Sequence, residues 1–466
     1  MENLEKNNQL SMNRITFKLA LPSIMEMFLH TLLGIADTAM VGALGGYAIA
    51  AISLTDNPVM LLIAVFAALS VGTTALVARF IGAKNYKDGE DTILQSLFLS
   101  LVLSIIFSLV GLLLSKNIVV LMGAEPDVVP YATKYMRIIM LGLPGLIITL
   151  IMSGALRGSG DTRTPMIVTG IANVLNIIGN FLLIFESRTV SLSLPLLDES
   201  FSIFIPGAGL GVTGAGIATT VGRYIATFLI LRILFNPKGE YNLDFSNFKI
   251  NKVIIRRIFK VGLPAAGEQL LFRSAQLAFF RIVASLGTVM IAAHKITITA
   301  ESISFMPGWG FALAATTLVG QYLGAEDKDN AKKGGYTAAY MAVSMMSVLG
   351  VVFFFFPEIF INIFTDDPEI SKYAVICLKI VAIAQPFLAI AMVFAGALRG
   401  AGDTKTVLIA TGLTSWVVRV GLGYILAIKM GYGLPGAWVA MVLDFGIRGI
   451  VFLLLFKKGS WQNIEV

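Results

Sequence analysis

The stretch Ala155–Thr162 reads ALRGSGDT, and Ala397–Thr404 reads ALRGAGDT, 242 positions later. The same offset relates further pairs, namely Ala20–Pro22 with Gly262–Pro264, Glu26 with Glu268, Val77–Ala83 with Val319–Ala325, and Pro144 with Pro386. A period this long is not that of a solenoid repeat. The chain is therefore predicted to be a duplicated half-protein.

The register between the two copies changes once. Gly214 and Ala215 match Gly436 and Ala437, so the offset falls from 242 to 222. The first copy thus carries an insert around Glu186–Pro206. Because the insert is rich in Pro and Ser, we expect an irregular surface loop on the outer side.

The composition excludes a soluble globular protein. Of 466 residues, 56% are hydrophobic and 14% are charged, whereas soluble domains carry about 25% charged residues. Apolar runs of about 20 residues or more recur, each long enough to cross a hydrocarbon core as a helix. The polar first 13 residues predict no cleaved signal peptide. The single cysteine, Cys377, excludes an intrachain disulfide and a CxxC motif.

Twelve apolar segments, six per copy, are predicted to be transmembrane helices, from Thr16–Gly42 to Leu434–Phe456. An even number of helices returns each copy to the side on which it starts. The expected fold class is an all-α membrane protein with two six-helix lobes, related by a pseudo-two-fold axis along the membrane normal. The expected organisation is a first lobe over residues 1–235, a linker over residues 236–257 and a second lobe over residues 258–466.

Lys and Arg concentrate in one set of loops, which includes the basic stretch Asn236–Lys260 and both ALRGxGDT loops. Because short cytoplasmic loops are enriched in Lys and Arg, we expect both termini to be cytoplasmic in a multi-pass protein of the cytoplasmic membrane. This placement also explains the formal net charge of +7 without nucleic acid. The stretch Asn236–Lys260 is the hinge candidate. The ALRGxGDT loops are either structural turns, with Gly at positive φ and Asp or Thr capping the next helix, or substrate contacts.

The sequence resembles the multidrug and toxic compound extrusion (MATE) family of secondary transporters over residues 15–456. The resemblance is carried by ADTAMVG at Ala36–Gly42, by ARFIGA and VGQYLGA, by the two ALRG(S/A)GDT loops, by Glu268, and by Asn173, Asn176 and Asn180. It implies a twelve-helix, two-lobed antiporter that expels organic compounds in exchange for H⁺ or Na⁺. Two departures stand out: Asn180 occupies a position where many relatives have an acid, and Ile380–Gly396 contains no acid. Ion sites at those two places cannot be carried over.

The first predicted helix bears a stripe of titratable residues. Glu26, His30 and Asp37 fall at i, i+4 and i+11, within about 40° on one helical face. Charged groups at membrane depth are costly and are functional candidates by default. We expect ion coupling at Asp37, assisted by Glu26 and His30. The alternative is a structural carboxylate hydrogen-bonded to amides of the fifth helix.

Asn173, Asn176 and Asn180 form an amide face on the fifth predicted helix. They could be oxygen ligands for Na⁺, partners that tune Asp37, or hydrogen bonds that hold helices together. For ion coupling we favour Asn176 and Asn180. A Na⁺ site would use Asp37 and Asn180.

The second copy has more cations than the first. Candidate cavity residues are Glu268, Arg273, His294, Lys295 and Glu301, and the first-copy positions that match Arg273, Lys295 and Glu301 are uncharged. Glu268 with Lys295 or an arginine could be a switchable pair or a permanent salt bridge. Asp444 and Arg448, at i and i+4, are typical of a helix ion pair. This cationic excess predicts that substrates include zwitterionic or anionic amphiphiles, bound near Lys295 or Arg273.

These features together predict an antiporter that exports amphiphilic small molecules by alternating access, driven by H⁺ or Na⁺, with no other cofactor. We expect a monomer in the lipid bilayer. A flippase for lipid-linked precursors is the first alternative, favoured by the cationic second copy and disfavoured by twelve helices. A polytopic enzyme acting on a lipid is the second. Neither a P-loop nor a metal-spaced His or Cys set occurs in the sequence, so we expect no enzyme.

Overall fold

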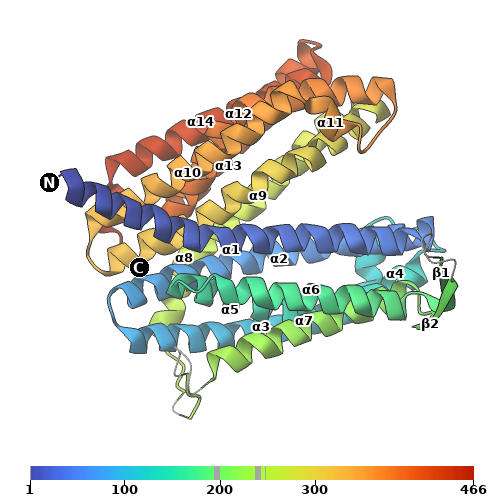
Figure 1. Ribbon diagram of the computed structural model, residues 1–466, viewed down its shortest axis with the longest axis horizontal. Coiled ribbons are helices and arrows are strands. Elements are labelled where there is room, and N and C mark those ends of the chain that lie inside the picture. Colours follow the sequence, from blue (N-terminus) through green and yellow to red (C-terminus); the bar gives the residue numbers. More distant parts are fainter. Residues whose placement is uncertain (1, 194–199, 237–242, 247, 466) are drawn as a thin grey trace.

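The computed structural model describes residues 2–193, 200–236, 243–246 and 248–465. The chain is almost entirely helical (Figure 1). Its elements are α1 (Glu2–Gly42), α2 (Gly46–Gly82), α3 (Tyr86–Leu121), α4 (Val129–Leu141), α5 (Leu143–Ser159), α6 (Arg163–Leu183), β1 (Glu186–Ser193), β2 (Ser200–Ala208), α7 (Val212–Leu234), α8 (Lys252–Ala284), α9 (Thr288–Gly324), α10 (Lys328–Phe355), α11 (Pro357–Ile361), α12 (Pro368–Gly400), α13 (Thr404–Leu413), the π-helical segments η1 (Thr414–Leu422) and η2 (Ile425–Lys429), α14 (Gly433–Lys458) and the 3₁₀ turn η3 (Ser460–Asn463).

The described residues contain ten helical segments long and apolar enough to cross a membrane, and the bent pair α4–α5 makes an eleventh. Helix α8 lies alongside them over 33 residues. It fails the same test of apolarity because it carries Glu268, Arg273 and Arg281 as well as a basic first half. With α8 included, the all-α, twelve-span, two-lobed fold predicted from the sequence is confirmed.

The two lobes repeat each other in detail, which confirms the duplication. In the first lobe, Thr74 Oγ1 donates to the Gly154 carbonyl at 2.8 Å. The residues 242 positions later do the same, since Thr316 Oγ1 donates to the Gly396 carbonyl at 2.8 Å. Each bond ties the second helix of its lobe to the fourth. Two separate hydrophobic cores surround these contacts, one in each half of the chain.

The first helix of each lobe begins against the opposite lobe. Leu19 and Ala20 of α1 pack in the core of the second half. Conversely, Ile254 and Ile258 of α8 pack in the core of the first half. The C-terminal parts of both helices then return to their own lobes. The lobes are therefore joined by an exchange of helix ends as well as by the linker.

The two lobes come into close backbone contact where α2 crosses α9. A Cβ added to Gly82 would lie 1.9 Å from the Gln321 carbonyl oxygen, and one added to Gly324 would lie 2.0 Å from that of Arg79. Only glycine allows this backbone contact. The two glycines are 242 positions apart, so the contact lies on the pseudo-two-fold axis. It is at the end of the bundle that carries both termini, and from there the lobes diverge (Figure 1).

Polar bonds across the lobes cluster at the same end. Gln321 Nε2 donates to the Gly158 carbonyl at 3.0 Å, and Thr317 Oγ1 donates to the Arg157 carbonyl at 2.8 Å. From the first lobe to the second, Arg79 Nη2 donates to the Ala401 carbonyl at 3.3 Å. The ALRGxGDT segments thus supply the carbonyl groups that hold the lobes together at this end.

The ALRGxGDT segments themselves end one helix and start another. Gly160 has φ 101° and Gly402 has φ 87°, which are left-handed values that favour glycine. Asp161 Oδ1 accepts from the Thr164 backbone N–H at 2.9 Å, and Asp403 Oδ1 accepts from that of Thr406 at 3.3 Å. Each motif therefore forms a glycine-ended helix followed by an aspartate cap, as its residue types indicate.

Three elements differ from the simple helical expectation. The fourth span is broken at Gly142 and bent by 44°, because Pro144 cannot donate a backbone hydrogen bond. The eleventh span continues from α13 into wider π-helical turns from Thr414 onward. The insert around Glu186–Pro206, expected to be an irregular loop, is instead a β-hairpin in which β1 pairs with β2 antiparallel. Alternating β-branched and polar residues such as Thr189–Ser191 favour this pairing.

The linker rests on the first lobe in its described parts. Gln95 Nε2 of α3 donates to the Lys249 carbonyl at 2.7 Å. The Phe235 and Phe245 rings stack with centroids 5.1 Å apart. Part of the hinge candidate, residues 237–242 and 247, lies outside the described residues. The hinge role of the linker stays a prediction.

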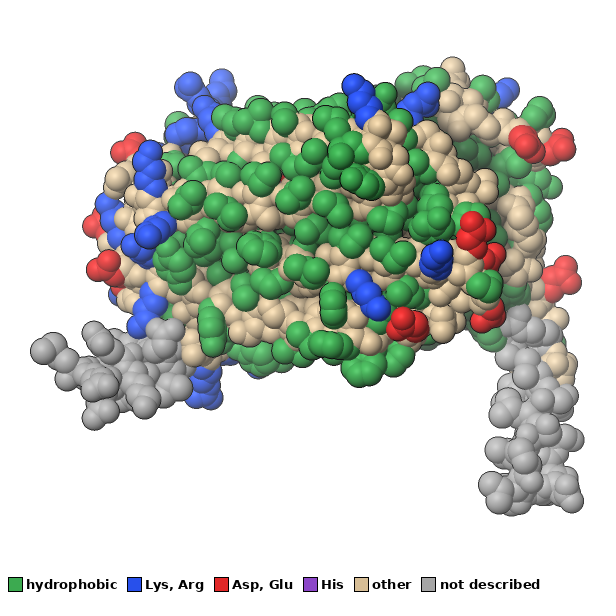
Figure 2. Space-filling view, turned by 90° about the horizontal axis from the view of Figure 1, so that it is seen from above, with side chains coloured by type: hydrophobic (Ala, Val, Ile, Leu, Met, Phe, Trp, Pro, Cys, Tyr) green, Lys and Arg blue, Asp and Glu red, His purple; other side chains and the backbone are tan. Residues whose placement is uncertain are grey.

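The surface matches a protein embedded in a bilayer. Figure 2 shows hydrophobic side chains over the middle of one face, and Lys and Arg gathered mainly at the end that carries the termini. Large apolar side chains are exposed, including Leu113, Leu277 and Val417. In water such exposure would promote aggregation, whereas lipid tails accept it.

The contact at Gly82 predicts how the lobes are held. Gly82→Val should push α2 away from α9, because its Cβ would collide with the Gln321 carbonyl. We expect the end bearing the termini to open, so that spin labels at Lys87→Cys and Asp329→Cys move apart in double electron–electron resonance, in a Cys377→Ser background.

The matched control is Gly446→Val, a helical position where an added Cβ meets nothing within 4 Å. It should leave the label distances as in the parent. An unchanged distance distribution in Gly82→Val would show that this contact does not hold the lobes together.

Candidate functional site

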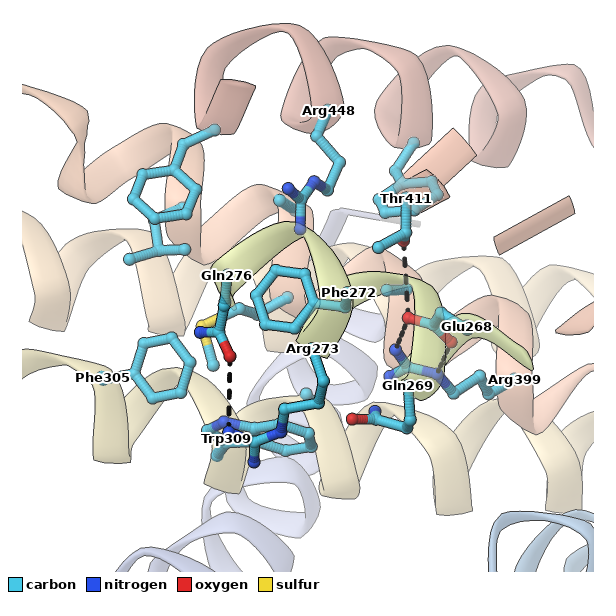
Figure 3. Close-up of a pocket in the computed structure, with 17 residues that line it drawn as sticks. Glu268, Gln269, Phe272, Arg273, Gln276, Phe305, Trp309, Arg399, Thr411 and Arg448 are labelled. Atoms are coloured by element: carbon cyan, nitrogen blue, oxygen red, sulfur yellow. Dashed lines mark hydrogen bonds and ion pairs between the residues drawn. The ribbon is translucent and has the colours of Figure 1, made fainter. Parts of the chain in front are cut away.

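Each lobe buries one glutamate–arginine pair at equivalent positions. In the first, Arg157 Nη1 donates to both carboxylate oxygens of Glu26 at 3.1 and 3.2 Å. In the second, Arg399 Nη2 and Nε donate to Glu268 Oε1 and Oε2 at 2.6 and 3.2 Å (Figure 3). All four side chains are at most 13% exposed. The pairs join the first helix of each lobe to the arginine of its ALRGxGDT motif.

Sequence reasoning singled out both glutamates but missed Arg157 and Arg399 as their partners. For Glu268 it considered Lys295 or an unspecified arginine of the lobe. The signal was present, because both members of each pair return at the same offset of 242. A charge and its counter-charge that are duplicated together indicate a contact that the shared fold requires.

A second polar cluster lies in the first lobe, between α1 and α6. Asn180 Nδ2 donates to Asp37 Oδ1 at 2.5 Å and to Asn176 Oδ1 at 3.0 Å. Both asparagines are buried, whereas Asp37 is half-buried. Asn173 Nδ2 donates to the Leu29 carbonyl at 2.8 Å and so also ties α6 to α1. The structure thus brings together three of the residues expected to couple ion movement: Asp37, Asn176 and Asn180.

The amide of Asn176 can serve Asp37 directly. With its oxygen and nitrogen exchanged, the nitrogen lies 3.1 Å from Asp37 Oδ1, and the oxygen accepts from Thr219 Oγ1 and N at 3.2 Å. In both orientations Asn176 connects α6 to α7. Arg223, also on α7, interacts electrostatically with Asp37 and Asp56. Neither Thr219 nor Arg223 was among the predicted site residues.

The three titratable residues of the stripe on α1 do not belong to one site. Glu26 and Asp37 are eleven residues apart, which is about 16 Å along a helix axis. His30 is exposed on α1, and its charged neighbours are Glu26 and Arg157. The stripe therefore divides into a Glu26–Arg157 pair with His30 beside it, and a separate carboxylate–amide cluster at Asp37.

The second lobe contains a further buried ionic network without a counterpart in the first. Asp444 Oδ2 accepts from Arg419 Nε at 2.9 Å and forms a close ion pair with Arg448. Arg448 also donates to Thr414 Oγ1 and Ser415 Oγ at 3.1 and 3.0 Å. Two guanidinium groups thus share one carboxylate beside the π-helical turns. Such turns often accompany functional sites.

The remaining candidates in the second lobe are scattered. His294 is buried among aromatic rings, with its centroid 5.6 Å from that of Trp438. Glu301 is buried near Arg419. Lys295 is exposed. Of the five candidates, only Glu268 and Arg273 line a common cavity in the second lobe.

A cavity of about 240 Å³ lies within the second lobe. Figure 3 shows Glu268, Arg273 and Gln276 entering it from α8, Phe305 and Trp309 from α9, and Arg448 from α14. The Glu268–Arg399 pair lies at one end of the cavity. We call this space the second-lobe pocket.

Among the described residues, no group of three or more His, Cys, Asp and Glu side chains could hold a metal ion. The Asp37 cluster nevertheless offers oxygen atoms suited to an alkali cation. Asn180 Oδ1 is buried and has no hydrogen-bond partner among the described residues, and an unsatisfied buried acceptor is costly. A carboxylate together with amide oxygens is the kind of donor set that a Na⁺ ion accepts.

Two parallel six-helix lobes with buried ionisable groups inside each are an architecture typical of secondary transporters. The MatE family model matches residues 22–182 and 264–425, one segment in each lobe. The chain therefore belongs to the MATE family of transporters, as the sequence motifs indicated, and is not an enzyme.

Two curated relatives match nearly the whole chain. The "Probable multidrug resistance protein NorM" of Thermotoga maritima is 33% identical over 449 residues, which cover 96% of this chain and 93% of the relative. The "Uncharacterized transporter YisQ" of Bacillus subtilis is 25% identical over 448 residues, which cover 96% and 94%.

Solved structures share the fold at 24% identity. The "Crystal structure of MATE in complex with MaD3S" superposes with a TM-score of 0.87 over 96% of each chain. A structure from Pyrococcus furiosus, described by the phrase "Reverse polarity of binding pocket suggests different function of a MOP superfamily transporter", superposes with a TM-score of 0.87 over 97% of each chain. These likenesses support the fold rather than the function.

The buried Glu26–Arg157 pair predicts a large stability loss when only one partner is removed. Arg157→Met leaves the Glu26 carboxylate buried without its counter-charge, which should lower the free energy of unfolding by about 3–5 kcal/mol. Thermal unfolding in detergent measures the effect.

The double variant Glu26→Gln/Arg157→Met removes both charges and should recover much of that stability. Arg163→Met, an exposed arginine at the start of α6, is the control and should unfold like the parent. If the double variant were no more stable than Arg157→Met, the loss would come from packing rather than from an unpaired charge.

Proposed function

We propose that the protein is an ion-coupled antiporter that exports organic amphiphiles across the cytoplasmic membrane by alternating access. The coupling ion is H⁺ or Na⁺, and it enters as the substrate leaves. The observation that carries this proposal is the Asp37 carboxylate, hydrogen-bonded to Asn180 at 2.5 Å inside the first lobe. The protein acts as a monomer, with both termini in the cytoplasm.

The chemistry of the Asp37 cluster supports coupling. A proton would neutralise Asp37, and a Na⁺ ion would compensate its charge while using the amide oxygens of Asn176 and Asn180. Both events weaken the charge-assisted bond between Asn180 and Asp37. Because this bond joins α1 to α6, ion binding would alter how α1 is held in its lobe.

Helix α1 is well placed to transmit this change. Its first half packs in the second lobe, and its second half carries Asp37 in the first. A change in how α1 packs against α6 therefore alters the junction between the lobes. An ion that favours one packing over the other would shift the balance between two conformations.

The names of relatives support the export of drugs and similar compounds. The Thermotoga maritima relative is called a multidrug resistance protein, and solved MATE structures include complexes with MaD3S and MaL6. The second-lobe pocket, lined by several aromatic side chains and by Met392, suits small amphiphilic molecules.

Proteoliposomes with independently imposed pH and Na⁺ gradients test the proposal. A gradient of the coupling ion should accelerate efflux of an amphiphilic fluorescent dye by the parent protein. Asp37→Asn should reduce efflux to the rate without a gradient, because an amide of similar shape can neither release a proton nor compensate Na⁺.

Asp329→Asn, which removes an exposed carboxylate at the start of α10, is the matched control and should keep the response. The proposal fails if neither gradient accelerates efflux in the parent. It also fails if Asp37→Asn retains the full response while expressing and folding normally.

A further inference from the structure

The second-lobe pocket combines an apolar wall with one free polar edge. Phe272, Phe305 and Trp309 supply aromatic surface. Arg273 and Gln276 lie one turn apart on α8 at its edge, and Arg273 Nη1 contacts Gln276 Oε1 at 3.4 Å (Figure 3). Arg273 is exposed, so its guanidinium is accessible to a ligand entering the pocket.

The charges around the pocket do not balance. Glu268 and Arg399 neutralise each other, and Asp444 is shared by Arg419 and Arg448. Even if the negative charge of Glu301 is taken to neutralise Arg419, the positive charge of Arg273 remains without a counter-charge. Within the described parts of the chain, no carboxylate forms an ion pair with it. The pocket therefore carries an excess positive charge at its edge.

The Phe272 ring does not compensate for this excess. A bare ring would attract a cationic ligand, but the guanidinium groups of Arg419 and Arg448 already lie over the Phe272 ring, 5.3 and 5.4 Å from its centroid. A cationic ligand would thus meet like charge on the ring side as well as at Arg273.

The first lobe lacks this arrangement. The positions that correspond to Arg273, Gln276, Phe305 and Trp309 are Thr31, Gly34, Ile63 and Ala67. The shared fold therefore does not require these side chains, whereas it does require the Glu–Arg pair present in both lobes. A role specific to the second lobe explains the difference.

We infer that the second-lobe pocket binds the carboxylate or sulfonate group of an anionic or zwitterionic aromatic amphiphile. Arg273 donates two parallel hydrogen bonds to the anionic group, with the Gln276 amide beside it, and the aromatic body lies against Phe305 and Trp309. The guanidinium group matches such groups in a forked geometry. The cavity volume, about 240 Å³, accommodates a small aromatic body. This inference rests on the proposed export function and names one class of its substrates.

Equilibrium binding of two dansyl probes of opposite charge tests this site. The probes are dansylglycine and dansylaminoethyl-trimethylammonium, added to the full chain in nanodiscs of neutral phosphatidylcholine, with empty nanodiscs as the blank. Energy transfer from tryptophan to dansyl reports occupancy near Trp309. We expect the parent protein to bind dansylglycine about tenfold or more tightly than the ammonium probe.

The variants assign the effect to Arg273. Arg273→Gln should weaken dansylglycine binding about tenfold and leave the ammonium probe unchanged or bound more tightly, because a charge-assisted bond is lost. Arg273→Lys should keep part of the affinity. Arg281→Gln removes an exposed arginine of the same helix that does not line the pocket, and it should change neither affinity by more than twofold. Trp309→Phe should reduce the energy transfer, while the other three tryptophans of the chain remain as donors.

Three results would overturn the inference: equal or tighter binding of the ammonium probe by the parent, equal losses in Arg273→Gln and Arg281→Gln, or energy transfer that is undiminished in Trp309→Phe. No ion gradient is present in this measurement. A negative result would therefore leave ion coupling at Asp37 untouched, and a failure of gradient-driven efflux would leave the binding site standing.

Discussion

The arrangement of the lobes depends on the backbone contact between α2 and α9 at Gly82 and Gly324. Each glycine faces a carbonyl oxygen of the other lobe at a distance that no Cβ permits. Polar side chains such as Gln321 then bond to carbonyls of the opposite lobe. Because all these contacts lie at one end, the lobes are closed there and diverge at the other (Figure 1). A transporter needs such a junction to be tight in one state and separable in another.

Duplication divides the buried charges into two kinds. The Glu–Arg pairs occur in both lobes at equivalent positions, so they belong to the common architecture: each fastens the lobe's first helix to its ALRGxGDT segment. The other buried charges occur once. Since a charge buried in a membrane protein is costly without a partner, those that only one lobe retains are the better guides to function.

We propose that side chains present in only one lobe give the two lobes different tasks. The first lobe would bind the coupling cation at Asp37, beside the Asn180 amide. The second lobe would bind an anionic group at the exposed Arg273, beside aromatic rings. Their separation explains how one chain could bind an ion and an organic molecule without direct competition. Helix α1, which packs against both lobes, provides the mechanical connection.

The sequence alone determined the membrane class, the duplication and the family, because apolar length and a fixed offset are properties of the linear chain. It also indicated the cap and turn at each ALRGxGDT loop, since Gly and Asp act on their immediate neighbours. Only the tertiary structure decided which charged and polar groups meet. It paired the two glutamates with Arg157 and Arg399. It joined Asp37 to Asn180 and left His30 apart, and it placed Arg273 rather than Lys295 in the pocket wall. The insert likewise formed a hairpin through pairing between strands. Such contacts depend on how helices and strands from distant parts of the chain are placed and turned toward each other, and periodicity within one segment does not specify that placement.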